Sequence, residues 1–337
     1  MKPASASLLA LTLGDPSGIG PEIIAKAWQQ RSPNSKPFVV VGDFATLAAA
    51  VGGDALVRRV DGVEQAATVF PDAIPLVDLP LAEAARPGQP SAHAAPAIIA
   101  WIERAVELAL EGQVSAVVTA PIAKATLYAA GFSFPGHTEF LGKLTERASF
   151  VGLRGPVMML AAKDLRTTLV TVHSPLTQVS AQLTTQAITR AITVTAQALK
   201  HDFGIANPRI AVAGLNPHAG EGGTIGREEF ETITPAITAL RAQGLNLTGP
   251  HSSDSLFHAE ARSRFDAVVC MYHDQALIPV KMLDFWGGVN ITLGLPIVRT
   301  SPDHGTAFDI AGQGLARPDS LLAAIDAARD IAACRAR

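Results

Sequence analysis

Three histidines follow short apolar runs that have the composition of buried strands. They are His173 after Thr168–Val172, His218 after Arg209–Gly214, and His273 after Ala267–Met271. In open α/β sheets, ligands bind beyond the carboxyl ends of the strands, so three such imidazoles can converge on one point. Three neutral imidazoles with an open fourth position suit a catalytic Zn²⁺ or a similar divalent ion. We therefore expect a metal site here, with three unrelated loop histidines as the alternative.

The residues beside two of these histidines strengthen the hypothesis. His218 lies in the stretch 216–226, which contains four glycines. Glycines let the backbone approach a ligand closely and can form a concavity that binds anions, although a flexible surface loop has the same composition. Asp274 follows His273 directly and could orient the imidazole, contact a substrate or cap a helix.

A second group of polar residues is suited to anions. His137 and Thr138 open a predicted helix, whose N-terminus would attract phosphate or carboxylate. Lys281, Asn290 and Arg299 lie in one span of the chain, and an arginine can hold a phosphate with two hydrogen bonds. Further candidates for pocket polar groups are Asp15, Lys124 and Asp254.

Nucleotide-binding fingerprints of the common kinds are absent from the sequence. No strict G-x-G-x-x-G occurs, so a standard Rossmann site is not expected. Residues 131–136 have Walker-like glycine spacing, but His137 stands where the lysine would be, which argues against an ATP-binding loop.

Apolar runs of strand length alternate with amphipathic segments along the chain. This alternation predicts an α/β fold with a largely parallel sheet. The expected strands are Leu8–Leu13, Phe38–Val41, Ala116–Thr119, Thr168–Val172, Arg209–Gly214, Ala267–Met271 and Asn290–Val298. The expected helices are Ala92–Glu111, Thr177–His201, Arg227–Gln243 and Asp319–Arg335, with Ser91, Thr177 and Asp319 as candidate N-caps. The segment Ala73–Pro90 is rich in proline and small residues and is expected to be a connecting loop.

Composition narrows the class of protein. The 337 residues are 48% hydrophobic, which is enough for one large or two medium domains. A net charge of -3, without basic runs, argues against nucleic-acid binding. The two distant cysteines favour a reducing compartment, so we expect a cytoplasmic protein. No apolar run is long enough to span a bilayer.

Several long motifs resemble those of the 4-hydroxythreonine-4-phosphate dehydrogenase family, and the resemblance covers essentially the whole chain. The motifs lie at Leu13–Glu22, Gly136–Phe140, Gly214–Gly223, Met271–Gln275, Gly288–Pro296 and Arg299–Thr306. The resemblance implies the isocitrate/isopropylmalate dehydrogenase fold, with two α/β lobes and a cleft between them. We place one lobe at 1–130 plus 300–337, with both termini and the cofactor loop. Residues 131–299 would form the other, with the metal and substrate residues and the dimer interface.

The resemblance also implies a site, residue by residue. His173, His218 and His273 would hold one divalent ion (Zn, Mg or Co), with the active site shared between the subunits of a homodimer. The substrate residues would be His137, Thr138, Lys281, Asn290 and Arg299. The loop that holds the adenosine of NAD or NADP would contain His304, Gly305, Thr306, Asp309 and Gly312.

The implied reaction is the oxidation of the C3 hydroxyl of 4-phosphooxy-L-threonine, in pyridoxal phosphate biosynthesis. The product, 2-amino-3-oxo-4-phosphooxybutanoate, would lose CO₂ to give 3-amino-2-oxopropyl phosphate. Lys281, Asp274 and Asp254 are the candidates for the general base or for orienting residues. Three alternatives remain open at this point: a 4-phospho-D-threonate or D-erythronate dehydrogenase of the same family, a zinc-dependent hydrolase, and a non-catalytic sensor of a phosphorylated metabolite.

Overall fold

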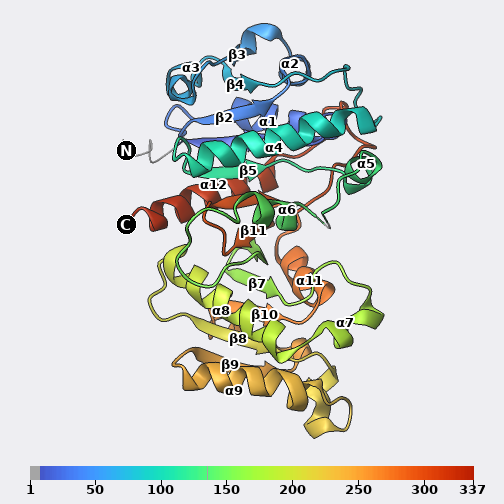
Figure 1. The fold of residues 1–337 in the computed structure, drawn as a ribbon, viewed down its shortest axis with the longest axis vertical. Coiled ribbons are helices and arrows are strands. Elements are labelled where there is room, and N and C mark those ends of the chain that lie inside the picture. Colours follow the sequence, from blue (N-terminus) through green and yellow to red (C-terminus); the bar gives the residue numbers. More distant parts are fainter. Residues whose placement is uncertain (1–7, 135) are drawn as a thin grey trace. The chain divides into compact units, whose positions relative to one another are not determined.

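The chain divides into two compact α/β units in a computed structural model that describes residues 8–134 and 136–337 (Figure 1). The first unit runs to Ser149 and resumes at Pro296–Arg337, and the second is Phe150–Leu295. The sequence placed these boundaries after residues 130 and 299. The first boundary lies later because Phe140 of the following helix packs with Phe132 and Phe134, and that helix also contacts helix α4 of the first unit.

The first unit has a parallel sheet. Its strand order is β3 (Val57–Arg59), β4 (Ile74–Asp78), β2 (Phe38–Gly42), β1 (Leu9–Thr12), β5 (Ala116–Thr119) and β12 (Arg299–Pro302). Its helices are α1 (Gly20–Gln29), α2 (Phe44–Val51), α3 (Ala66–Val69), α4 (Ala95–Leu110), α5 (Lys124–Ala129), α6 (His137–Leu144) and α12 (Asp319–Arg335). β1, β2 and β5 are fully buried apolar runs, as strands covered on both faces should be.

The second unit has a mixed sheet. Its order is β11 (Val289–Leu293), β6 (Val157–Ala162), β7 (Leu165–Leu169), β10 (Ala267–Cys270), β8 (Arg209–Ala213) and β9 (Asn246–His251). β6 runs antiparallel to both β11 and β7, and the remaining pairs are parallel. Its helices are α7 (Leu176–Gln182), α8 (Thr185–His201), α9 (Thr234–Ala242), α10 (Ala259–Arg262) and α11 (His273–Leu283).

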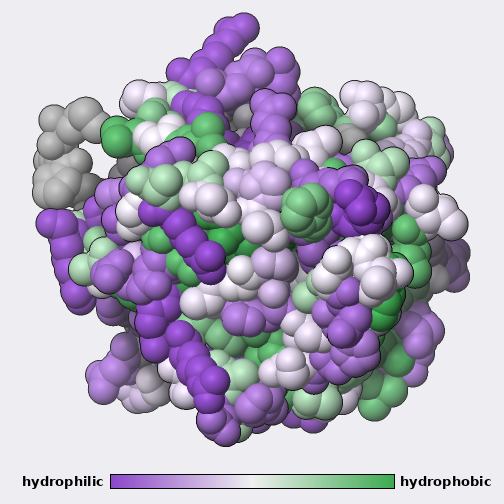
Figure 2. Space-filling model, turned by 90° about the horizontal axis from the view of Figure 1, so that it is seen from below, coloured by the Kyte–Doolittle hydropathy of each residue, from purple (hydrophilic) through white to green (hydrophobic). Residues whose placement is uncertain are grey.

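Helices α8 and α11 cover opposite faces of the second unit's sheet. The hydroxyl of Thr167 donates to the carbonyl of Ala276 in α11 (3.5 Å), whereas the hydroxyl of the next residue, Thr168, contacts that of Thr195 in α8 (3.0 Å). Successive side chains of a strand point to opposite faces, so these neighbours identify the helix on each side. Figure 2 shows one face of the molecule, on which hydrophilic and apolar residues are interspersed.

Most of the predicted elements are confirmed, and the differences have local causes. Ala73–Pro90 is not only a loop, because it contains β4. The predicted helix Thr177–His201 is broken at Leu183 and Thr184, whose backbones are extended.

The candidate N-caps had mixed outcomes. Ser91 caps the turn that leads into α4, where its hydroxyl accepts from the backbone N–H of His93 (3.3 Å). Thr177 and Asp319 are not N-caps, because Pro175 and Pro318 hold those positions. Among the helices of the described residues, none is both long and apolar enough to cross a membrane.

The core beneath α11 generates a stability prediction. Leu160 is 1% exposed in a cluster that includes Ala276 and Val280 of that helix. Leu160→Ala should therefore lower the free energy of unfolding by about 2–5 kcal/mol. Val151→Ala, at a position that is 91% exposed, should change it by less than about 0.5 kcal/mol. Equilibrium urea unfolding measures both, and equal effects would contradict this description of the core.

Candidate active site

Positive charge gathers around the N-terminus of α6 in the first unit. Arg299 is 3% exposed on β12, and its Nε and Nη2 donate to the hydroxyl of Thr119 (3.2 and 2.6 Å). Burial lowers the pKa of Arg299 to about 10, which still leaves the guanidinium charged at neutral pH. The ammonium of Lys124 lies beside Gly136, where an added Cβ would be 3.3 Å from Nζ. Two cations and the helix N-terminus favour an anion here, although the carboxylate of Glu139 is also present, with Oε2 at 3.0 Å from the same added Cβ.

His137, the first residue of α6, presents a donor at this site. Nη2 of Arg299 lies 3.4 Å from Nδ1 of His137, and because a guanidinium only donates, Nδ1 must be the acceptor. The proton of the neutral ring is then on Nε2, a buried atom that has no hydrogen-bond partner among the described residues. Burial, with the charges of Arg299 and Lys124, holds the pKa of His137 well below its usual range. Thr138 is buried next to it.

Asp15 occupies a neighbouring strand end. Its Oδ1 accepts from the backbone N–H of Ser17 (3.0 Å), and its carboxyl also accepts from the backbone N–H of Ala123. The side chain is fully buried, Oδ2 has no partner among the described residues, and burial raises the pKa of the carboxyl. Asp15 thus joins the turns that follow β1 and β5, and it leaves one oxygen for a ligand.

The predicted cofactor loop, 304–312, follows β12 and packs against helix α1. The carbonyl of Thr306 accepts from the backbone N–H of Ile19 (2.9 Å), and an added Cβ on Gly18 would lie 2.9 Å from the same oxygen. Lys26 donates to Glu22 and to the carbonyls of Gly314 and Ala316 (2.8, 2.8 and 2.6 Å). A cavity of about 380 Å³ adjoins this loop and is lined by α1, α2, Gly312 and Gly314. His304, Gly305, Thr306, Asp309 and Gly312 therefore lie on one loop that α1 holds in place.

Two of the three histidines lie side by side in the second unit. Beyond β7, the backbone N–H groups of Val170 and Thr171 donate to the carbonyls of Cys270 and Met271 (2.9 and 3.2 Å). This pairing brings the rings of His173 and His273 to a centroid separation of 5.8 Å. Nδ1 of His273 lies 2.8 Å from Oδ1 of Asp274, which leaves Nε2 as the nitrogen that faces a ligand.

His218 is exposed on the loop after β8, close to Asp254. Its positive charge, when protonated, is one of the factors that lower the pKa of Asp254, after the hydrogen bond from Ser252. Among the residues that the structure describes, no group of three His, Cys, Asp or Glu side chains is placed to hold a metal ion. His218 is therefore not joined to the His173–His273 pair within one chain.

The remaining predicted residues are distributed between the units. Lys281 lies on α11, with Nζ 5.3 Å from the ring centroid of Phe285. Asn290 lies on β11, and its buried Oδ1 has no hydrogen-bond partner among the described residues. Lys281 and Asn290 thus belong to the second unit, whereas His137, Thr138 and Arg299 belong to the first.

Sequence reasoning missed the residues that support the site. Thr119 binds Arg299, and Gln275 is buried, where it donates to the carbonyl of Gly214 (2.6 Å) and accepts from the backbone N–H of Met271 (2.6 Å). Glu229 accepts from the backbone N–H groups of residues 215 and 216. Only Gln275 lies in a quoted motif, and no periodicity or spacing marks the other two.

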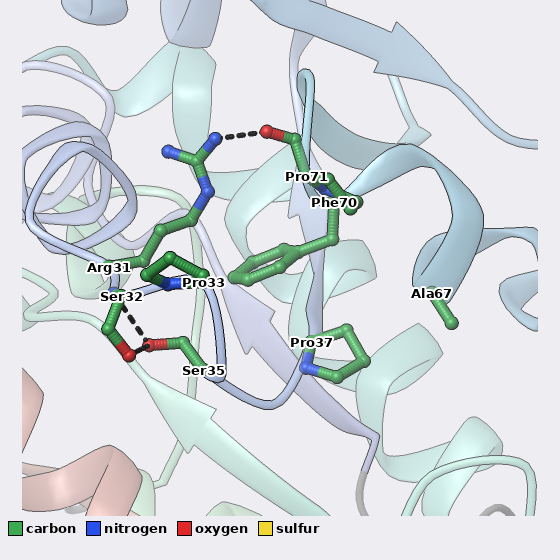
Figure 3. A pocket seen from close by; sticks show the side chains of 8 residues that line it. All are labelled: Arg31, Ser32, Pro33, Ser35, Pro37, Ala67, Phe70 and Pro71. Carbon is green, nitrogen blue, oxygen red and sulfur yellow. Dashed lines mark hydrogen bonds between the residues drawn. The ribbon is translucent and has the colours of Figure 1, made fainter.

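A larger cavity, of about 570 Å³, lies elsewhere in the first unit (Figure 3). It is lined by Arg31, Ser32, Pro33, Ser35, Pro37, Ala67, Phe70 and Pro71. The guanidinium of Arg31 donates to the carbonyl of Pro71 and stacks on Trp28 at 3.6 Å from the ring centroid. None of the predicted site residues lines this cavity, so its size alone does not make it the active site.

The arrangement is that of an α/β enzyme with an anion site and a set of imidazoles, and the comparisons with known proteins specify it further. Residues 34–328 match the family model of the pyridoxal phosphate biosynthetic protein PdxA. The chain is 64% identical over 327 residues to a 4-hydroxythreonine-4-phosphate dehydrogenase from Caulobacter vibrioides, covering 97% of this chain and 98% of that protein. A similar protein from Maricaulis maris is 54% identical, covering 98% and 99%.

Solved structures point to the same group of proteins as the sequence comparisons. The crystal structure of 4-hydroxythreonine-4-phosphate dehydrogenase from Klebsiella pneumoniae matches with a TM-score of 0.86 and 42% identity, covering 97% of this chain and 99% of that one. A terephthalate 1,2-cis-dihydrodiol dehydrogenase from Burkholderia xenovorans matches with a TM-score of 0.63 and 33% identity, covering 96% and 98%.

The chain belongs to the PdxA family of pyridoxal phosphate biosynthetic proteins, which confirms the resemblance seen in the sequence. It is an oxidoreductase with the expected isocitrate/isopropylmalate dehydrogenase-like fold. Because the chain belongs to a family of dehydrogenases, two of the alternative functions, a zinc-dependent hydrolase and a non-catalytic sensor, are excluded.

The lowered pKa of His137 generates a pH prediction. Its folded pKa lies below the unfolded value of about 6.5, so the unfolded chain binds the extra proton as pH falls. Wild-type stability should fall by up to about 1.4 kcal/mol per pH unit below about pH 6.5 from this group alone. His137→Asn should lack this contribution. Urea unfolding between pH 5 and 8 measures the difference, and parallel stability profiles for the two proteins would contradict the assignment.

Proposed function

We propose that the chain catalyses the NAD(P)-dependent and divalent-metal-dependent oxidation of 4-phosphooxy-L-threonine. The product, 2-amino-3-oxo-4-phosphooxybutanoate, loses CO₂ to give 3-amino-2-oxopropyl phosphate in pyridoxal phosphate biosynthesis. The observation that carries the proposal is the pair of adjacent imidazoles, His173 and His273, the second of which is oriented by Asp274. The names of the relatives give the substrate its identity.

The histidines suit a divalent ion such as Zn²⁺, Mg²⁺ or Co²⁺. Two imidazoles bound to one Zn²⁺ at about 2.0–2.1 Å have ring centres roughly 5 Å apart. The 5.8 Å between His173 and His273 is close to this value, and a carboxylate on the second ring nitrogen is the usual partner of a metal-binding histidine. His218 is the third ligand in the proposal. A divalent ion bound there lowers the pKa of a substrate hydroxyl and thereby eases loss of its proton.

The chain's own residues bind the substrate and move the proton. Arg299, His137 and Thr138 bind an anionic group of the substrate, with Nε2–H of His137 as a donor. Lys281 and Asn290 are further substrate contacts in the proposal. Binding energy from groups remote from C3 then positions the reacting carbon.

Lys281, Asp274 and Asp254 are the candidates for the base that receives the hydroxyl proton. Asp274 is engaged with His273, and the lowered pKa of Asp254 makes its carboxylate a weak base.

A bound NAD or NADP would supply the hydride acceptor for this reaction. The loop that contains His304, Thr306 and Asp309 is the part of the chain proposed to hold the adenosine. The adjoining cavity of about 380 Å³ falls in the range of small-molecule sites and supports this assignment.

A spectrophotometric assay tests the proposed activity. With 4-phosphooxy-L-threonine, Zn²⁺ and NAD⁺ or NADP⁺, absorbance at 340 nm should rise, and chelation should abolish the rise. Arg299→Lys should lower kcat/KM by at least about tenfold, because lysine cannot reproduce the two guanidinium bonds. If the enzyme turned over 4-phospho-D-threonate or D-erythronate and not the L-threonine derivative, the proposed substrate would be wrong. If chelation left turnover unchanged, the proposed requirement for a metal would be wrong.

A homodimer with a shared site is also part of the proposal. The exposed side chains of Ile278 and Met282 lie one turn apart on α11, the helix that begins with His273, and the exposed side chains of Phe285 and Trp286 follow just after its end. Exposed apolar patches of this kind mark interaction surfaces, and a second copy would supply the ligand that one chain does not bring to the pair.

Met282→Lys should therefore break the dimer and reduce turnover by at least about tenfold, because an unpaired charge would be buried in the interface. Light scattering coupled to gel filtration measures the mass. Val151→Lys, at another exposed apolar position of the second unit, is the control and should remain dimeric. A Met282→Lys protein that stays dimeric and fully active would contradict this interface.

A further inference from the structure

The loop that carries His218 has an unusual backbone. Residues 218–223 all have positive φ, with values of 51° at His218, 50° at Ala219, 80° at Gly220, 43° at Glu221, 66° at Gly222 and 96° at Gly223. Three of these residues are not glycine, and side chains other than glycine rarely adopt this region. Such a conformation persists only where the surroundings hold it, and it tends to occur at functional sites.

The buried side chain of Glu229 holds this loop. Glu229 is 5% exposed, and its Oε1 accepts from the backbone N–H groups of Leu215 and Asn216, both at 2.7 Å. Its Oε2 accepts from Nδ2 of Asn216 at 2.9 Å. Both oxygens are thus bound by the residues that directly precede the left-handed turn.

Two glycines pack closely against the same carboxylate, and a third packs against the amide of Asn216 that it binds. An added Cβ would lie 3.0 Å from Oε1 of Glu229 at Gly214 and 2.7 Å from Oε2 at Gly220. At Gly226 it would lie 2.1 Å from Nδ2 of Asn216, which is itself bound to Glu229. The loop is therefore wrapped around the carboxylate, and a change in the carboxylate is transmitted to the turn that contains His218.

We infer that Glu229 is a positioning residue for the metal ligand His218. The carboxylate fixes the backbone of Leu215 and Asn216, and the turn that it supports directs the imidazole. This inference rests on the proposed function, in which His218 binds the divalent ion. It assigns to Glu229 a role in metal affinity, in addition to any contribution to stability.

Glu229→Gln tests the inference with Zn²⁺ alone as the probe. The substitution keeps the size of the side chain but replaces one acceptor oxygen with an NH₂ group. That group cannot accept the hydrogen bonds that Leu215 and Asn216 donate. Zn²⁺ affinity, measured by competition with a chelating dye, should fall about 10–100-fold, as when other supporting residues of metal ligands are removed. Glu231→Gln is the matched control, because Glu231 is exposed two residues later and pairs only with Arg227 among the ion pairs of the described chain. The control should bind Zn²⁺ as wild type does.

A pair of glycine variants separates the carboxylate from backbone strain. Gly220→Ala and Gly222→Ala both place a side chain at positive φ, but only the Cβ at position 220 meets the Glu229 support, at 2.7 Å from Oε2 of Glu229 and 2.8 Å from the carbonyl of Gly226, since nothing lies within 4 Å of a Cβ at position 222. Gly220→Ala should therefore weaken Zn²⁺ binding more than Gly222→Ala does. Thermal unfolding without metal reports the stability of each variant separately, so this pair still decides the matter if Glu229→Gln does not fold.

Comparison with His218→Ala distinguishes failure of the positioning role of Glu229 from failure of the proposed metal site. If His218→Ala loses Zn²⁺ affinity while folded Glu229→Gln retains it, the positioning role is wrong and the metal site stands. If His218→Ala binds Zn²⁺ as tightly as wild type, the proposed metal site itself is wrong. Equal losses for the variants at positions 220 and 222 would also overturn the role of Glu229.

Discussion

The pairing of backbone groups beyond the ends of β7 and β10 is the interaction on which the proposed chemistry depends. The N–H groups of Val170 and Thr171 donate to the carbonyls of Cys270 and Met271, respectively. The hydroxyl of Thr171 also donates to the carbonyl of Met271, at 2.7 Å. Parallel strands end at a common edge, so continuing the pairing past the strands fixes where the next side chains lie. His173 and His273 are brought together by this pairing, although 100 residues separate them in the sequence.

Buried polar groups in each unit support the functional side chains. Gln275 ties the turn after β10 to the carbonyl of Gly214 after β8, and Thr119 ties β5 to Arg299. Each of these bonds is shielded from water, so the loss of one partner would leave the other unpaired at a substantial cost. The order of the site therefore comes from a buried network of hydrogen bonds as much as from the strands themselves.

Electrostatics divide the candidate site by chemical task. In the first unit, burial together with the charges of Arg299 and Lys124 lowers the pKa of His137, so its neutral ring can donate a hydrogen bond without carrying charge. In the second unit, the imidazoles of His173 and His273 are accompanied by the carboxylate of Asp274. The first group carries the charge that favours anions and the second carries ligands that favour cations, which suits the phosphorylated substrate and the divalent ion of the proposed function.

The sequence predicted the fold class and many strands because buried parallel strands read as continuous apolar runs, as in 116–119 and 267–270. It missed β4 because Pro75 interrupts the apolar run of that strand and the surrounding segment is rich in proline and small residues. It also missed the break between α7 and α8, where a threonine hydroxyl competes for a backbone N–H.

For the candidate site, position beyond strand ends marked the histidines as candidate metal ligands, and the family resemblance supplied the candidate substrate residues. The supporting role of Glu229 could not be predicted, since it depends on a three-dimensional turn that has no periodic signature in the sequence.

Anomalous X-ray diffraction at the zinc absorption edge, from crystals of the Zn²⁺-loaded protein, tests the central claim most directly. The account predicts one strong peak at about 2.0–2.1 Å from ring nitrogens of His173, His218 and His273, with Asp274 still bound to the far nitrogen of His273. A peak that lies elsewhere would contradict the account. So would a peak that has no His218 ring nitrogen, from either copy of the chain, within bonding distance.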